Sequence, residues 1–136
     1  MNTIKCKTHK FTKFITFLMI FVGISGCFSV LFGAWLAHAG ATLPEDIHER
    51  LSSALHYQFI HTLVLFVSLL WYQHKPSKFI ALASLGFFLG ILAFSGSLYL
   101  KTWLMLDWLG KAAPFGGSLL ALAWLFIAIA GKKFND

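Results

Sequence analysis

Charged residues are scarce in this chain of 136 residues, and four long stretches contain none of them. Asp, Glu, Lys and Arg together make up 12% of the sequence, about half of the roughly 25% that is typical of soluble domains. The charge-free stretches are 14–44, 51–74, 79–100 and 112–131. Each meets the roughly 20 residues that a helix needs to cross about 30 Å of hydrocarbon.

This pattern predicts an all-α integral membrane protein with four transmembrane helices in a compact bundle. An open sheet is excluded because its edge amides would stay unsatisfied in lipid. We expect a single membrane domain over 1–136, with helices at about 14–39, 55–73, 79–100 and 112–131. An outer amphipathic segment is expected at about 43–55.

Cysteines and carboxylates are also few, and their scarcity excludes several chemistries. Cys6 and Cys27 form no CxxC motif, which argues against disulfide exchange. No carboxylate lies in the four charge-free stretches to complete a metal shell or to orient a catalytic histidine. The sequence ISGC, which ends at Cys27, matches a lipoprotein cleavage signal, but the apolar run continues to residue 39, so we expect an uncleaved helix. We therefore expect no enzyme activity, no metal and no cofactor.

The net charge of +6 is distributed unevenly between the predicted connections. Eight of the eleven basic residues precede the first helix, separate the second from the third, or follow the fourth: Lys5, Lys7, Lys10, Lys13, Lys75, Lys78, Lys132 and Lys133. The other connections hold Arg50, Lys101 and Lys111 together with Glu45, Asp46, Glu49 and Asp107. The positive-inside rule predicts that both termini are cytoplasmic. The lipid bilayer is the expected partner, nucleic acid is not, and a homo-oligomer or a membrane-protein partner is left open.

The segment between the first two helices has the pattern of a helix start. Thr42 and Glu45 fit a capping box, and Pro44 suits the first turn. Ile47 and Leu51 begin an apolar face with a spacing of four residues. We expect an amphipathic helix that either runs into the second transmembrane helix or bends against it.

Small residues mark the faces on which membrane helices approach one another. They recur every four positions in the first helix (Ser25, Ser29, Gly33, Ala37) and in the fourth (Ala113, Gly117, Ala121). The third helix carries GFFLG, with Gly86 and Gly90, and Ala93 and Ser97 continue that face. Gly116 and Gly117 are expected to admit a neighbouring backbone. These faces predict tight packing within one chain.

Polar residues gather in the outer half of the predicted bundle. The second helix opens with HYQFIHTL, in which Tyr57, Gln58 and His61 share a face at helical spacing. The predicted topology brings eight candidates into one layer: His38, His56, Tyr57, Gln58, His61, Ser95, Ser97 and Tyr99. One interpretation is a hydrogen-bonded clasp between helices. The other is a binding site in which His38 and His61 hold haem or a metal, or relay a proton.

Four segments carry a resemblance to a known family: GAWLAHA, HYQFIHTL, LAFSGSLYL and APFGGSLLALAW. In this order and spacing they resemble the motifs of the YgdD-like family of small four-helix proteins of the bacterial inner membrane, to which an animal transmembrane protein is related. The resemblance runs from about residue 20 to residue 125. It implies a multi-pass location in the inner membrane and assigns no activity to any residue.

The resulting hypothesis is a non-enzymatic structural or accessory protein of the inner membrane. One alternative is a small transporter or ion-coupled carrier, although the first helix lacks the acidic residue that small multidrug exporters use. Another is a redox subunit linked to haem or quinone through the outer histidines.

Overall fold

A computed structural model describes the backbone of residues 2–132 and the side chains of residues 13–132. The described chain is helical and contains no strand. Four helical spans are long and apolar enough to cross a membrane: Lys13–Thr42, Glu45–His74, Lys78–Leu104 and Asp107–Lys132. For the described residues, the prediction of an all-α chain with four helices long and apolar enough to span a membrane is thereby confirmed.

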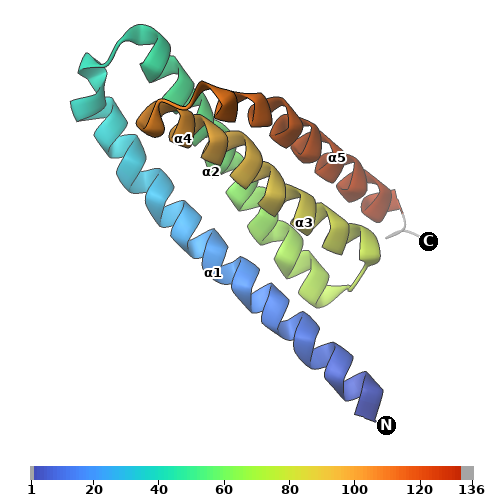
Figure 1. Cartoon of the computed structure of the whole chain (residues 1–136). Coiled ribbons are helices and arrows are strands. Elements are labelled where there is room, and N and C mark those ends of the chain that lie inside the picture. The colour runs from blue at the N-terminus through green and yellow to red at the C-terminus, as the bar shows by residue number, and fades with distance from the viewer. Residues whose placement is uncertain (1, 133–136) are drawn as a thin grey trace.

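Successive spans run in opposite directions (Figure 1). Helix α1 (Asn2–His38) is followed by the 3₁₀ turn η1 (Ala39–Thr42) and by α2 (Glu45–His74). The start of α1, the turn between α2 and α3 (Lys78–Ile91), and the end of α5 (Ala113–Lys132) lie toward one end of the molecule (Figure 1). The N-terminal part of α1 extends beyond the other helices at that end.

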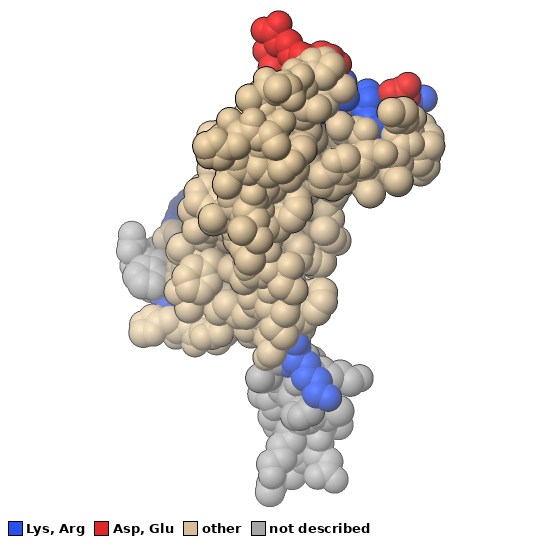
Figure 2. Space-filling model, turned by 90° about the vertical axis from the view of Figure 1, so that its left-hand side faces the viewer, with Lys and Arg blue, Asp and Glu red and all other residues tan. Residues whose placement is uncertain are grey.

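The two ends of the bundle differ in charge. The end with the α2–α3 turn carries Lys13, Lys75, Lys78 and Lys132, and we call it the lysine end. The opposite end carries Glu45, Asp46, Glu49 and Asp107, and we call it the acidic end. On the face drawn in Figure 2, red side chains appear only at the acidic end. Two basic residues at that end form ion pairs: Arg50 with Asp46 at 3.4 Å, and Lys101 with Asp107 at 3.5 Å. Lys133, which the sequence groups with the lysine end, lies outside the described residues.

Helix α2 is continuous from Glu45 to His74. Of the two arrangements expected for 43–55, the structure therefore has the one in which this segment runs into the second span. The expected capping box at Thr42 is wrong. The N-cap is Pro44, which has no side-chain hydrogen bond, and the Thr42 hydroxyl instead donates to the Ala39 carbonyl at 3.3 Å. The short η1 turn ends at Thr42 and holds it too far from the helix start to cap it.

The third span contains three helical segments rather than one. Helix α3 begins after Ser77, whose hydroxyl oxygen accepts a hydrogen bond from the Phe79 amide. The chain then forms one π-helical turn, η2 (Leu92–Gly96), before α4 (Ser97–Leu104) completes the span. A π turn inserts an extra residue and rotates the next part of the helix about its axis. The turn η3 (Asp107–Ala112) connects α4 to α5.

The interior contains two apolar clusters. The larger cluster joins all four spans and consists of Leu18, Leu65, Leu69, Ala83, Phe87, Ile91, Leu120 and Ala123. The smaller one lies nearer the acidic end and consists of Phe32, Leu36, Leu51, Ala54 and Tyr99. A belt of polar side chains lies between the two clusters, and it includes Ser25, Gln58 and Ser95.

Glycines allow several of the close helix contacts. A Cβ atom on Gly33 would lie 3.4 Å from Leu55 of α2, and one on Gly86 would lie 3.0 Å from the Cβ of Ala123 of α5. A Cβ on Gly90 would approach Leu120 Cδ2 to 2.5 Å.

Gly116 approaches its neighbour most closely of these glycines, because its added Cβ would overlap the backbone of Phe94 in η2. Gly117 has more space, with its nearest neighbour at 3.8 Å on the Phe94 ring. On the same helix, Ala121 is exposed.

Candidate functional site

The first part of the polar belt joins α1 to α2. Gln58 is buried, and its amide nitrogen donates to the Ser25 hydroxyl at 2.9 Å and to the Ser25 carbonyl at 3.3 Å. Thr62, one turn along α2, shares a 2.7 Å hydrogen bond with the same Ser25 hydroxyl. Ser29 donates to the Ser25 carbonyl at 2.8 Å. Ser25 is therefore the centre of a network that connects two helices.

The second part of the belt joins α2 to α5 through His61. The Nδ1 atom of this buried ring lies 2.7 Å from the Tyr57 carbonyl, which can only accept, so Nδ1 must carry the proton. The Nε2 atom then accepts from the indole nitrogen of Trp124 at 3.3 Å. His61 is thus neutral, with a fixed tautomer, and both of its ring nitrogens are used within the protein.

The third part joins α2 to the π turn. The buried hydroxyl of Ser95 donates to the Ala54 carbonyl at 2.7 Å. That carbonyl lies one helical turn before Gln58, so η2 and α2 are connected at the same level as the other two contacts. In contrast, Ser97 bonds within its own span, to the Phe94 carbonyl at 2.9 Å.

Tyr99 belongs to an aromatic cluster rather than to the hydrogen-bond network. Its ring stacks on Trp103 with centroids 5.6 Å apart and meets Phe28 and Phe32 edge to face at 5.5 and 5.3 Å. Its buried hydroxyl has no hydrogen-bond partner among the described residues. Tyr99 therefore holds α4 against α1 through ring packing.

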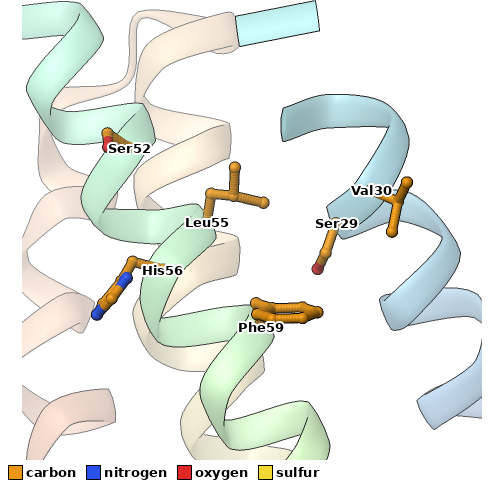
Figure 3. Close-up of a pocket in the computed structure, with 6 residues that line it drawn as sticks. All are labelled: Ser29, Val30, Ser52, Leu55, His56 and Phe59. Carbon is orange, nitrogen blue, oxygen red and sulfur yellow. The ribbon is translucent and has the colours of Figure 1, made fainter. Parts of the chain in front are cut away.

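The remaining candidates lie on the surface of the bundle. His38 and His56 are exposed, and Tyr57 is exposed over 42% of its area while its ring packs against Phe94. His56 lines an open pocket of about 330 Å³ between α1 and α2. Figure 3 shows that Leu55 and Phe59 point toward α1 in this pocket, whereas the His56 imidazole is directed away from α1.

The structure thus brings together only part of the predicted layer. The Gln58 side chain bonds to Ser25 of α1, and His61 bonds to Trp124 of α5, although the two are only three residues apart on α2. Ser95 of the π turn bonds to the Ala54 carbonyl of α2. No group of three His, Cys, Asp or Glu side chains converges within the described part of the chain. The sequence reasoning placed Ser25 and Ser29 on a contact face without assigning their hydrogen bonds, and it did not single out Thr62 or Trp124.

Comparison with known proteins adds the family to this description. Residues 32–117, which include most of the belt, match the family model described as protein of unknown function, DUF423. The chain is 33% identical over 114 residues to a UPF0382 membrane protein of Haemophilus influenzae, covering 82% of this chain and 90% of the relative. The chain belongs to the DUF423 family. The expected resemblance to the YgdD-like proteins is confirmed, because the inner membrane protein YgdD of Escherichia coli is among the relatives.

Other relatives match this chain over nearly their whole length. The UPF0382 inner membrane protein YgdD of Escherichia coli is 30% identical over 120 residues, with 88% of this chain and 92% of the relative covered. The UPF0382 membrane protein YwdK of Bacillus subtilis is 29% identical over 119 residues, covering 85% and 96%. No solved structure matches the chain significantly. The four apolar spans and the names of these relatives together identify a membrane protein.

Proposed function

We propose that this protein is a non-enzymatic structural or accessory component of the bacterial inner membrane, and that its polar belt is a clasp that fixes the positions of the helices. The observation that carries the proposal is the bonding of His61. Both ring nitrogens are engaged, one with the Tyr57 carbonyl and one with the Trp124 indole. A haem or metal ligand needs a free ring nitrogen, and a proton relay needs a ring that can exchange its proton.

The bonding of Gln58 supports the same proposal. Its amide nitrogen donates to both the hydroxyl and the carbonyl of Ser25 on the neighbouring helix, so this donor is already used within the protein. Polar side chains inside a membrane domain are stabilised when they find such partners, at about 0.6–2 kcal/mol per interhelical bond. A clasp accounts for Gln58, His61 and Ser95 without a ligand.

The proposal is tested by native mass spectrometry of the full chain released from mild detergent, together with a visible absorption spectrum. We expect no mass increment that matches haem or a metal, and no haem band. A mass shift or absorption band that matches haem or a metal and disappears in His61→Leu, but not in His56→Leu, would replace the clasp with a binding site. His56 is the matched control because it is an exposed histidine on the same helix.

Transport is the second alternative, and flux measurements address it separately. Proteoliposomes loaded with a pH-sensitive dye should show no proton flux above that of empty vesicles when a gradient of a monovalent or divalent cation is applied. Flux that requires His61 would contradict the proposal, since a neutral ring with both nitrogens bonded has no site for a transported proton.

We further propose that both termini lie in the cytoplasm. The described lysine end holds Lys13, Lys75, Lys78 and Lys132 and no carboxylate, which matches the side that the positive-inside rule assigns to the cytoplasm. The inner-membrane location rests on the name of the YgdD relative.

Single cysteines test this orientation in a chain whose Cys6 and Cys27 are replaced by serine. Glu49→Cys at the acidic end should react with a membrane-impermeant maleimide in intact bacterial cells. His74→Cys at the lysine end should react only after the inner membrane is opened. Both positions are exposed, so they differ in their end of the bundle and not in accessibility. The reverse pattern would overturn the proposed orientation.

A further inference from the structure

A second pocket lies at the lysine end, away from the polar belt. Its volume is about 540 Å³, and it is formed by α1, the end of α2, the α2–α3 turn and the first two turns of α3. Its lining includes Phe14, Tyr72, Ser77, Lys78, Leu82 and Leu85. The clasp uses none of these residues. We propose that this pocket binds one anionic phospholipid of the surrounding membrane.

The side chains along the pocket change from polar to apolar in one direction. Ser77 and Lys78 lie at the start of α3, and Leu82 and Leu85 follow at intervals of four and three residues, which places all three α3 residues on one helix face. The rise from Lys78 to Leu85 is about 10 Å. The pocket therefore offers a polar mouth and an apolar floor that is long enough for the upper part of an acyl chain.

The mouth is suited to a negatively charged headgroup. Lys78 is exposed, and its ammonium nitrogen lies 5.5 Å from the centre of the Phe79 ring, beside the start of α3. The Ser77 hydroxyl accepts a hydrogen bond from the Phe79 amide, which leaves its hydrogen able to donate to a phosphate oxygen. The partial positive charge of the α3 N-terminus adds to the charge of Lys78.

The wider charge distribution supports the same ligand. Among residues 13–132 the lysine end carries no Asp or Glu, so no carboxylate competes with a phosphate for Lys78. At the acidic end, by contrast, Arg50 and Lys101 are each paired with a carboxylate. An anion near the membrane surface is therefore attracted to the lysine end.

The apolar floor distinguishes a lipid from a free phosphate. Leu82 and Leu85 are partly exposed on the surface of a membrane-spanning helix, at 45% and 36% of their areas. Free phosphate would leave this surface uncovered, whereas a phospholipid covers it with an acyl chain and places its phosphate at Lys78. A ligand that matches both parts of the pocket carries a phosphate and an acyl chain in one molecule.

The test uses the full chain in mild detergent, titrated with phosphatidylglycerol or phosphatidylcholine and monitored by native mass spectrometry. We expect the first bound phosphatidylglycerol to be held more tightly than phosphatidylcholine. Lys78→Gln should weaken phosphatidylglycerol binding about fivefold, which corresponds to the loss of one lysine near the headgroup. It should weaken phosphatidylcholine binding less, because the choline cation already offsets the charge of that lipid's phosphate. Inorganic phosphate at millimolar concentration should not displace the lipid.

Lys132→Gln is the matched control, because it removes one positive charge from the same end but does not line the pocket. Ala81→Leu, which adds bulk to the pocket floor, should weaken the binding of both lipids. Equal losses in Lys78→Gln and Lys132→Gln would mean that charge attracts lipid without a specific site and would overturn the proposal. So would equal affinity of the wild-type chain for the two lipids, or displacement of the lipid by phosphate. Lys78 is exposed, so its replacement should leave the helical content unchanged, which circular dichroism checks.

Discussion

The contact between Gly116 and the π turn gives the sharpest prediction of stability. In Gly116→Ala the new Cβ would overlap the Phe94 amide nitrogen and lie 2.7 Å from both the Ala93 carbonyl carbon and the Phe94 Cα. Carbon atoms are in favourable contact at about 3.5–4.0 Å. All three neighbours are backbone atoms, so no side-chain rotation can relieve the overlap, and α5 must move away from η2.

The adjacent glycine provides the matched control. In Gly117→Ala the nearest atom to the new Cβ is Phe94 Cδ2 at 3.8 Å, an ordinary contact. Both substitutions raise helix propensity by about 1 kcal/mol, because both lie in the same helix. The propensity gain therefore cancels when the two variants are compared. The difference that remains is the cost of overpacking, about 1–3 kcal/mol.

The assay is reversible unfolding in mixed detergent micelles, followed by circular dichroism. We expect Gly117→Ala to be as stable as the wild type or more stable, and Gly116→Ala to be less stable than Gly117→Ala by about 1–3 kcal/mol. If Gly116→Ala proved as stable as Gly117→Ala, then α5 could not pack on the backbone of η2 as described. The attribution of this contact to a missing Cβ would be refuted.

Two further comparisons address the clasp in the same assay. His61→Leu and Gln58→Leu should each lower stability by about 0.6–2 kcal/mol because they remove bonds to α5 and α1, while His56→Leu should not; equal melting of all three would contradict a structural role for the belt. Ser95→Ala should cost about 0.6 kcal/mol or more because it leaves the Ala54 carbonyl without its interhelical donor, whereas Ser97→Ala loses only a bond within its own span. Equal losses for the two serine variants would show that the Ser95 bond does not join the helices.

The four spans could be predicted because lipid requires long charge-free helices, and this requirement is visible in a single sequence. The helix boundaries were harder to predict from the sequence. The choice between a bent and a continuous α2 depends on how Leu51 and Ala54 pack against neighbouring spans, and periodicity does not report that packing. Likewise, Thr42 has the right spacing for a cap, but its position depends on the η1 turn before it.

The polar candidates were found because polar residues inside apolar stretches are conspicuous. Their partners were harder to predict. Gln58 and His61 lie close together on a helical wheel, yet a separation of three residues is enough to direct one toward α1 and the other toward α5. Trp124 was missed because an aromatic residue in an apolar run looks like a lipid-facing residue until the opposite helix places an acceptor beside its indole nitrogen.

The Ser25 network has a consequence for how the chain enters the membrane. The first span is the least buried of the four, and α1 packs chiefly against α2. During synthesis α1 is made first and enters the lipid before the other spans. Helix α2 follows and contains Gln58 and Thr62, whose polar groups are unfavourable in hydrocarbon unless they are hydrogen-bonded. The hydroxyl and carbonyl of Ser25 are already at that depth when α2 inserts. The first helix thus provides a hydrogen-bonding partner for the second before the third and fourth spans exist.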